Sequence, residues 1–337
     1  MTAGKTQLKR GQSAAVTVDL TAVIVAVTDG EPRVLTIGGG AGGADEGLPS
    51  GPLARRHRTL EQGLRAWVEA QTGQSLGYVE QLYTFGDLDR QPAAAGAAAR
   101  VLSVGYLALV REPRSEAGAP ATWRDWYRYF PWEDWRRGRP AVLDGLEPPL
   151  AAWAEAAPTV GERQGRRERL AVAFGIGSGR WSEDRVLERY ELAYETGLVP
   201  EVHRDHPAVR LPGPEQGTGI SMRADHRRIL ATAIARLRGK IKYRPVVFEL
   251  MPPAFTLLQL QQAVEALSGI RLHKPNFRRL VDQQGLVEDT GAVTLETGGR
   301  PARLVRFRRE ALVERPAPGL HVRAPRAARQ GGRRRKA

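Results

Sequence analysis

Residues 255–307 decide the fold of this chain and read FTLLQLQQAVEALSGIRLHKPNFRRLVDQQGLVEDTGAVTLETGGRPARLVRF. They open with a Thr-x-x-Gln capping box at Thr256 and Gln259, in which each side chain accepts a hydrogen bond from a backbone N–H at the start of a helix. Leucine and valine then recur at helical spacing until Gly269, a residue typical of a helix end. We therefore predict a first helix that begins at residue 257 and ends before Gly269.

A second helix is predicted to begin at Pro275 and to end at Gly285, because proline favours the first helical position and glycine favours the position after the last. Beyond it the apolar period becomes that of strands. Residues 286–288 and 293–297 look extended, and 302–307 return after a glycine turn. Two helices joined by a short turn and followed by a two-stranded ribbon are the order of a winged helix-turn-helix.

Such a module lays its second helix in the major groove of DNA. Its polar residues, with the arginines of the ribbon or "wing", are the candidate DNA contacts. They are Lys274, Asn276, Arg278, Arg279, Arg300 and Arg303. Arginines at the start of such a helix can read guanine edges, and wing arginines hold phosphates or a narrow minor groove. The alternative is a winged helix that contacts another protein and merely exposes a basic face.

The distribution of charge favours a polyanionic partner. The formal net charge is +14, from 51 basic and 37 acidic residues. Residues 216–337 carry 25 of the basic and 9 of the acidic residues, a net of +16, which leaves −2 for the rest. The positive charge therefore coincides with the winged helix pattern, as expected of a DNA-binding protein. A membrane surface is a weaker alternative, because no amphipathic helix here carries a strongly basic polar face without a globular partner.

Composition excludes several kinds of site. The chain has no cysteine, so disulfides, cysteine zinc sites and thiol catalysis are excluded. The first residues lack the apolar core of a signal peptide, and no run of about 18 apolar residues could span a bilayer. We expect a soluble, cytoplasmic protein.

The first half of the chain has the pattern of a sheet domain. Residues 16–27 are apolar enough for an interior strand. Residues 33–37 return as a hairpin after an Asp-Gly turn. Two more strands are expected at 78–83 and 101–110.

Residues 48–76, LPSGPLARRHRTLEQGLRAWVEAQTGQSL, resemble the Nudix box, whose pattern is G-x5-E-x7-R-E-U-x-E-E-x-G-U with U an aliphatic residue. The loop at residues 48–51, a helix from Thr59 and the closing Gly73 match this pattern. The residues at its catalytic positions do not match. Counted back from Gly73, the Arg-Glu pair falls on Ala66 and Trp67, the Glu-Glu pair on Ala70 and Gln71, and the upstream Glu on Arg58.

In active Nudix enzymes these glutamates hold a divalent metal against a diphosphate. Magnesium requires hard carboxylate oxygens, which alanine, tryptophan and glutamine do not supply. The resemblance therefore implies a Nudix-like domain without hydrolysis, and we predict no catalytic residue and no metal.

Residues 123–139, WRDWYRYFPWEDWRRGR, are dense in aromatic residues and arginine. Two interpretations stay open. The segment is a ligand wall or a dimer contact, since aromatic faces stack on adenine and arginine pairs with diphosphate. Alternatively, it is a packed segment that covers the sheet.

A degenerate Nudix domain followed by a winged helix resembles the Nudix-related transcriptional regulators of NAD metabolism. The likeness rests on RRILATAIARLRGKIKYRPVVFELMPPAFTLLQLQQAVEALSG at 227–269, followed by NFRR and GGRPARLVRF. It implies an α+β chain, with an N-terminal Nudix-like mixed-sheet α/β/α domain and a C-terminal winged helix-turn-helix. It also implies a repressor that binds an inverted-repeat operator of double-stranded DNA as a homodimer. Binding of ADP-ribose or a related NAD-cycle nucleotide would release the DNA, with no cofactor required and no membrane contact.

We predict a basic tail at 1–14, the Nudix-like sensing domain at 15–199, a linker at 200–218, the winged helix domain at 219–315 and a disordered basic tail at 316–337. A pocket without metal must offset diphosphate charge by other means. The candidate ligand residues are Arg55, Arg56, Trp67 and Arg90. The alternative function is a Nudix-type nucleotide hydrolase with a nucleic-acid-binding C-terminal domain.

Overall fold

The computed structural model describes residues 16–38, 46–87, 100–111, 121–177, 179–208, 217–295, 301–314 and 319–320. The strands are β1 (Val16–Thr28), β2 (Glu31–Ile37), β3 (Ser50–Pro52), β4 (Tyr78–Phe85), β5 (Arg100–Leu109), β6 (Ala121–Asp125), β7 (Val287–Thr294) and β8 (Ala302–Phe307). The α-helices are α1 (Leu60–Thr72), α2 (Val142–Glu155), α3 (Val160–Phe174), α4 (Val186–Glu195), α5 (Pro200–Asp205), α6 (His226–Ile241), α7 (Leu257–Ser268), α8 (Lys274–Gln284) and α9 (Ala311–Glu314). Short 3-10 helices are η2 (Trp126–Arg128), η3 (Pro131–Glu133) and η4 (Val246–Leu250).

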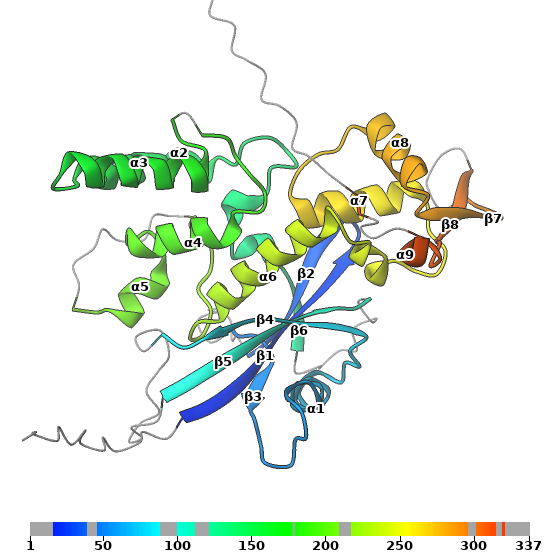
Figure 1. Cartoon of the computed structure of the whole chain (residues 1–337), viewed down its shortest axis with the longest axis horizontal. Helices are drawn as coiled ribbons and strands as arrows, with labels where there is room; N and C mark the ends of the chain where they lie inside the picture. Colours follow the sequence, from blue (N-terminus) through cyan, green and yellow to red (C-terminus); the bar gives the residue numbers. More distant parts are fainter. Residues whose placement is uncertain are drawn as a thin grey trace, which may run out of the picture.

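A mixed sheet forms the centre of the molecule (Figure 1). Its strand order is β4-β5-β1-β2-β6, with β3 paired to β1. Strands β1 and β5 run parallel and the other pairs antiparallel. One face of β1 packs on Leu64 and Val68 of α1, and the other face belongs to the large core that includes α6 and α7. The predicted strands and the α/β/α arrangement are confirmed.

Helix α6 joins the two predicted domains. Its buried residues, among them Ile229, Leu237 and Ile241, belong to the same core as sheet residues and residues of α7. The sheet and the winged helix therefore share one continuous hydrophobic core. None of the helices within the described ranges is long and apolar enough to cross a membrane.

The region predicted as a linker, 200–218, needs correction. Residues Pro200–Asp205 form α5, and its Glu201 and Val202 are buried. Residues 209–216 lie outside the described ranges. The predicted disordered tail also needs correction at Leu320, which is fully buried and whose N–H donates to the Ile241 carbonyl at 3.0 Å. The remainder of that tail and the predicted tail at 1–14 lie outside the described residues.

The winged helix forms where the sequence predicts it. Thr256 and Gln259 make the reciprocal capping box of α7. Gly269 then has φ +72°, and a Cβ there would lie 2.4 Å from the Glu133 carbonyl oxygen, so both the backbone and the space require glycine. Strands β7 and β8 form the wing, and Phe255 pairs with Val305 to tie it to the start of α7.

The aromatic segment 123–139 is packed against the sheet and helices. Trp126, Tyr129, Phe130 and Trp132 are fully buried. Their rings fill the space beside the sheet, so the structure favours the packed interpretation of this segment. Between this segment and α4 the chain forms a hairpin of α2 and α3, at the upper left of Figure 1, which the sequence analysis did not predict.

One carboxylate in this segment pairs with two buried arginines. Glu133 accepts from Arg189 Nε at 2.5 Å and from Arg238 Nη1 at 2.6 Å, and all three side chains are 0% exposed. Arg189 also donates to the Ala173 carbonyl of α3, and Arg238 donates to the Leu267 carbonyl of α7, at 2.8 and 2.9 Å. Removing the carboxylate would leave two buried guanidinium charges facing each other.

Glu133→Gln is therefore expected to lower the free energy of unfolding by about 3 to 5 kcal/mol. Urea denaturation followed by tryptophan fluorescence measures this change. Glu155→Gln is the matched control, because Glu155 pairs with Arg167 on the exposed surface, and it should leave the midpoint unchanged. Equal midpoints for the two variants would contradict the role assigned to Glu133.

Candidate nucleic-acid interface and nucleotide site

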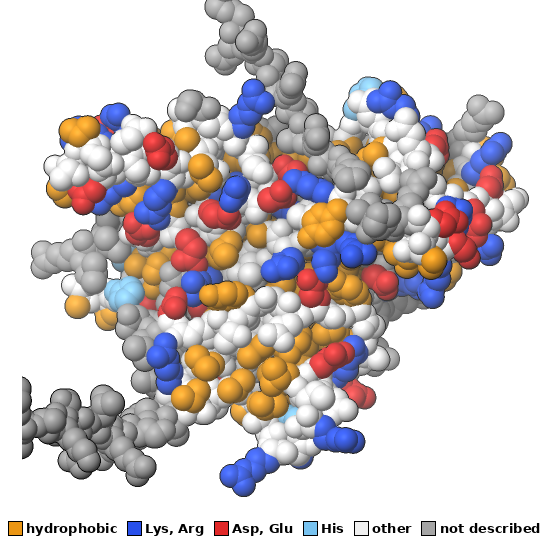
Figure 2. Space-filling model, in the orientation of Figure 1, with side chains coloured by type: hydrophobic (Ala, Val, Ile, Leu, Met, Phe, Trp, Pro, Cys, Tyr) orange, Lys and Arg blue, Asp and Glu red, His pale blue; other side chains and the backbone are white. Residues whose placement is uncertain are grey.

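Helix α8 presents a basic face to solvent. Phe277 and Val281 point into the core, which leaves the opposite side of the helix exposed. A shallow open recess of about 470 Å³ runs along that side, lined by Lys274, Pro275, Arg278, Arg279, Asp282 and Gln283. Figure 2 shows Lys and Arg side chains over this helix at the upper right. Four of the predicted DNA contacts, Lys274, Asn276, Arg278 and Arg279, are exposed on α8.

The arginines of α8 differ from those of the wing in their partners. Within the described residues, Arg278 and Arg279 make no ion pair, so their N–H groups remain available to a nucleic acid. Arg303 is 80% exposed and lies 3.5 Å from Asp289, and Arg306 pairs with Glu288 at 2.6 Å. These two wing arginines therefore already have a carboxylate partner, whereas Arg278 and Arg279 have none among the described residues. Arg300 lies outside the described residues.

The turn between α7 and α8 is fixed by the buried Glu265. Its Oε1 accepts from the Leu272 N–H at 2.9 Å and from Gln261 Nε2 at 2.9 Å. Gln261 also donates to the Leu272 carbonyl at 3.2 Å. The direction of α8 is therefore determined by the last turns of α7.

The segment that resembles the Nudix box forms the expected helix, α1. The residues that replace the glutamates of the box make structural contacts. Gln71 donates to the Ser50 carbonyl at 2.7 Å and accepts from the Ser50 N–H at 3.1 Å. Trp67 donates to the Pro52 carbonyl at 2.9 Å, and its ring covers Gly51, where a Cβ would lie 2.4 Å from it. At two positions that align with glutamates of active enzymes, these side chains instead fasten α1 to β3.

The remaining carboxylates of α1 do not form a metal site. Glu61 pairs with Arg65 at 2.7 Å, one turn along the same helix. Across the described ranges, no group of three or more histidine, aspartate or glutamate side chains could hold a metal ion.

The predicted ligand residues are only partly brought together. Arg55 and Arg56 are exposed in the turn before α1, and neither makes an ion pair with a described residue. Trp67 of α1 is half-buried, and its ring packs against β3. Arg90 lies outside the described residues.

A cluster of arginines around Glu46 was missed by the sequence analysis. The buried Glu46 accepts from Arg124 Nε at 2.7 Å and from the Tyr129 hydroxyl at 2.5 Å, and Arg128 lies 3.9 Å away. Burial alone would raise the pKa of the Glu46 carboxyl, but these hydrogen bonds and charges outweigh it and hold the pKa below its usual value. Arg124 and Arg128 keep about a third of each side chain exposed.

The backbone at Glu46 and Leu48 is hydrogen-bonded to the start of α6 and to Arg223, which precedes that helix. The Arg223 N–H donates to the Glu46 carbonyl at 2.9 Å, and the Leu48 N–H donates to His226 Nδ1 at 2.9 Å. Burial and neighbouring arginines lower the pKa of His226 to about 3, so this ring is neutral near pH 7. A Cβ on Gly47 would lie 3.0 Å from Arg223 Nη2. Three arginines, Arg124, Arg128 and Arg223, therefore surround the loop that enters the box, and Glu46 neutralises only part of their charge.

Comparison with known proteins identifies the C-terminal part. Residues 247–307 match the family model of the NrtR DNA-binding winged helix domain. The C-terminal domain is therefore similar to the winged helix of that family. A curated relative, the ADPR responsive transcriptional repressor NtrR of Acinetobacter baylyi, is 41% identical over 93 residues. The match covers 28% of this chain and 37% of that repressor's length.

Solved structures show the same fold over most of the chain. The crystal structure of Shewanella oneidensis NrtR complexed with a 27mer DNA aligns with a TM-score of 0.50 and 20% identity, over 88% of this chain and 95% of that one. A MutT/nudix family protein from Enterococcus faecalis aligns with a TM-score of 0.50 and 14% identity, over 90% of each chain. The predicted fold, a Nudix-like domain followed by a winged helix-turn-helix, is confirmed, as is the resemblance to the Nudix-related regulators.

The contacts of Gln71 predict that glutamate, the residue of the Nudix pattern at this position, would make the protein less stable. Gln71→Glu should lower the free energy of unfolding by about 1 to 3 kcal/mol, because a carboxylate cannot donate to the Ser50 carbonyl. Ala70→Glu adds the same charge at the neighbouring exposed position and should have a smaller effect. Thermal unfolding measures both, and a loss that is equal in the two variants would contradict the assignment.

Proposed function

We propose that this chain is a DNA-binding transcriptional repressor of NAD-metabolism genes that acts in the cytoplasm. Its Nudix-like domain would bind ADP-ribose or a related nucleotide without hydrolysing it, and this binding would release the DNA. The observation that carries the proposal is the exposed basic face of α8 within an NrtR-type winged helix. The similarity to the ADPR responsive transcriptional repressor of Acinetobacter baylyi supports the effector and the repressor role.

The proposed DNA-bound species is a homodimer on an inverted repeat. A single α8 covers too few base pairs to specify one site in a genome, and two copies related by a twofold axis double the sequence that is read. Arg278 and Arg279 are the proposed base-reading residues. Lys274, Asn276, Arg300 and Arg303 would hold the flanking backbone.

The proposed nucleotide site lies around the entry to the box helix. Arg55, Arg56 and Arg90 remain the proposed phosphate contacts, with Trp67 against the ligand. Arg124, Arg128 and Arg223 are added to them because they surround Glu46 and Gly47 directly before the box. Guanidinium groups supply positive charge that a bound metal supplies in active Nudix enzymes. The loss of the aligned glutamates supports binding without hydrolysis.

Arg278→Ala or Arg279→Ala should weaken operator binding by about 1 to 3 kcal/mol and weaken binding to random DNA less, if the arginine contacts a guanine edge. Fluorescence anisotropy at fixed salt measures both affinities, and sedimentation of the complex should give two protomers per operator. Arg236→Ala is the control, because Arg236 is exposed on α6 and lies 3.8 Å from Glu80 of β4. An equal loss on both DNAs, or one protomer per operator at full affinity, would contradict this part of the proposal.

ADP-ribose should bind the free protein more tightly than the operator-bound protein, by a coupling of about 1 to 3 kcal/mol, and it should weaken operator binding by the same factor. Calorimetric titration of the two forms measures the coupling. An assay for AMP in the presence of magnesium tests hydrolysis in parallel. Rapid magnesium-dependent release of AMP would instead support a nucleotide hydrolase with a DNA-binding domain.

A further inference from the structure

The tip of the β1–β2 hairpin contacts the winged helix domain. Thr28 and Glu31 are paired, which leaves a two-residue turn of Asp29 and Gly30. Both turn residues have positive φ, 51° and 75°, as in the tight turns that match the twist of a hairpin. A Cβ on Gly30 would lie 3.8 Å from Cβ of Gln262, so this tip packs directly against α7.

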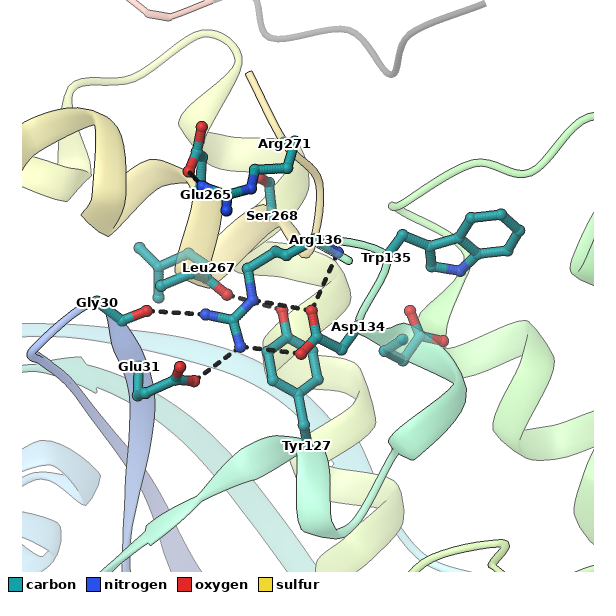
Figure 3. A network of polar contacts seen from close by, with 12 residues as sticks. Gly30, Glu31, Tyr127, Asp134, Trp135, Arg136, Glu265, Leu267, Ser268 and Arg271 are labelled. Carbon is teal, nitrogen blue, oxygen red and sulfur yellow. Dashed lines mark hydrogen bonds and ion pairs between the residues drawn. The ribbon is translucent and has the colours of Figure 1, made fainter. Parts of the chain in front are cut away.

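Arg136 connects this tip to the aromatic segment (Figure 3). Its Nη1 donates to the Gly30 carbonyl at 2.8 Å, and its Nη2 donates to Glu31 Oε2 at 2.7 Å. Asp134 accepts from Nε at 2.8 Å and from Nη2 at 2.9 Å. The side chain is 15% exposed, and it lies between carboxylates from two separate segments. We call Gly30, Glu31, Asp134 and Arg136 the Arg136 bridge.

The neighbours of the Arg136 bridge contact the C-terminal end of α7. The Arg136 guanidinium lies 5.1 Å from the centre of the Tyr127 ring, and the Tyr127 hydroxyl donates to the Ala266 carbonyl at 2.7 Å. The Trp135 N–H donates to the Gly269 carbonyl at 2.7 Å. These carbonyls belong to the last turn of α7 and its cap, directly before the turn that Glu265 fixes and that sets the direction of α8.

The opposite end of β2 lies at the proposed nucleotide site. Ile37 pairs with Gly47, and the Glu46 carboxylate accepts from the Thr36 hydroxyl at 3.1 Å. Strand β2 has seven residues and spans about 23 Å at the usual rise of about 3.3 Å per residue. It is paired on both sides, with β1 and β6. This strand therefore connects the Glu46–Gly47 loop, through Ile37, to Glu31 by one hydrogen-bonded stretch of backbone.

We propose that Arg136 is a positioning residue that transmits the state of the nucleotide site to α8. The route runs from the Glu46–Gly47 loop through β2 to the Arg136 bridge, and from the bridge through Tyr127 and Trp135 to the end of α7. This inference rests on the proposed function and specifies its regulation. Arg136 touches neither DNA nor nucleotide in this account, so its loss should uncouple the two ligands while each still binds.

The test compares full-length wild type, Arg136→Ala, Glu31→Ala and Arg139→Ala. Operator affinity is measured by anisotropy with and without saturating ADP-ribose, and ADP-ribose affinity is measured by calorimetry. Arg139→Ala is the matched control, since Arg139 lies in the same segment but pairs with Asp144 and Glu147 of α2 at 2.5 and 2.7 Å. Glu31→Ala is the milder variant, because Asp134 still neutralises Arg136. Hydrogen–deuterium exchange of residues 266–272 is followed in all four proteins.

Wild type and Arg139→Ala should show a ligand effect on operator affinity of about 5- to 150-fold. In Arg136→Ala, ADP-ribose should change the operator affinity by less than about twofold. The affinities of this variant for operator alone and for ADP-ribose alone should each differ from wild type by less than about threefold. The ADP-ribose effect in Glu31→Ala should lie between those of wild type and Arg136→Ala. General destabilisation would lower both separate affinities instead. Coupling in Arg136→Ala equal to that of wild type would overturn the inference.

If ADP-ribose does not change the operator affinity of the wild type, the proposed effector is wrong. The hydrogen–deuterium exchange data then test on their own whether the Arg136 bridge is connected to α7. Faster exchange at 266–272 in Arg136→Ala but not in Arg139→Ala would support a mechanical connection between hairpin tip and α7. Unchanged exchange would overturn it.

Discussion

The Glu133 carboxylate, buried between Arg189 and Arg238, is the interaction on which the arrangement of the domains depends. Each arginine reaches past Glu133 to a carbonyl in the last turn of a helix, at Ala173 of α3 and Leu267 of α7. The partial negative charge of those helix ends helps to balance two guanidinium groups against one carboxylate. Because buried charges tolerate little displacement from their partners, this cluster fixes the aromatic segment, α4, α6 and α7 relative to one another.

Two basic regions lie outside this rigid centre: the exposed face of α8 and the arginine cluster around Glu46. On α8, Phe277 and Val281 bind the helix to the core, and the basic side chains face solvent without described acidic partners. Around Glu46, arginines share one buried carboxylate at the entry to the box helix. In the box itself, Gln71 and Trp67 hold α1 against β3 where active enzymes hold metal. At these two positions the box makes structural contacts, and arginine side chains lie near its entry.

Local signals in the sequence predicted the elements well and their contacts poorly. The capping box at Thr256, the glycine at 269 and the proline at 275 depend on neighbouring residues, and the structure places α7 and α8 accordingly. The box pattern likewise predicted a helix from Thr59, and the structure places α1 there. Contacts such as Arg124 with Glu46 join residues 78 positions apart, and no local pattern encodes them. The same reason hid the role of Glu133, whose partners Arg189 and Arg238 lie 56 and 105 positions further along the chain.

The most direct test of the account is footprinting of the purified protein on the DNA upstream of its own gene, with and without ADP-ribose. A dimeric, ADP-ribose-released repressor should protect a tract with two half-sites in inverted orientation, and the protection should be lost on adding the nucleotide. Protection without any symmetric pair of half-sites, or no protected tract at a concentration that binds random DNA, would contradict the account.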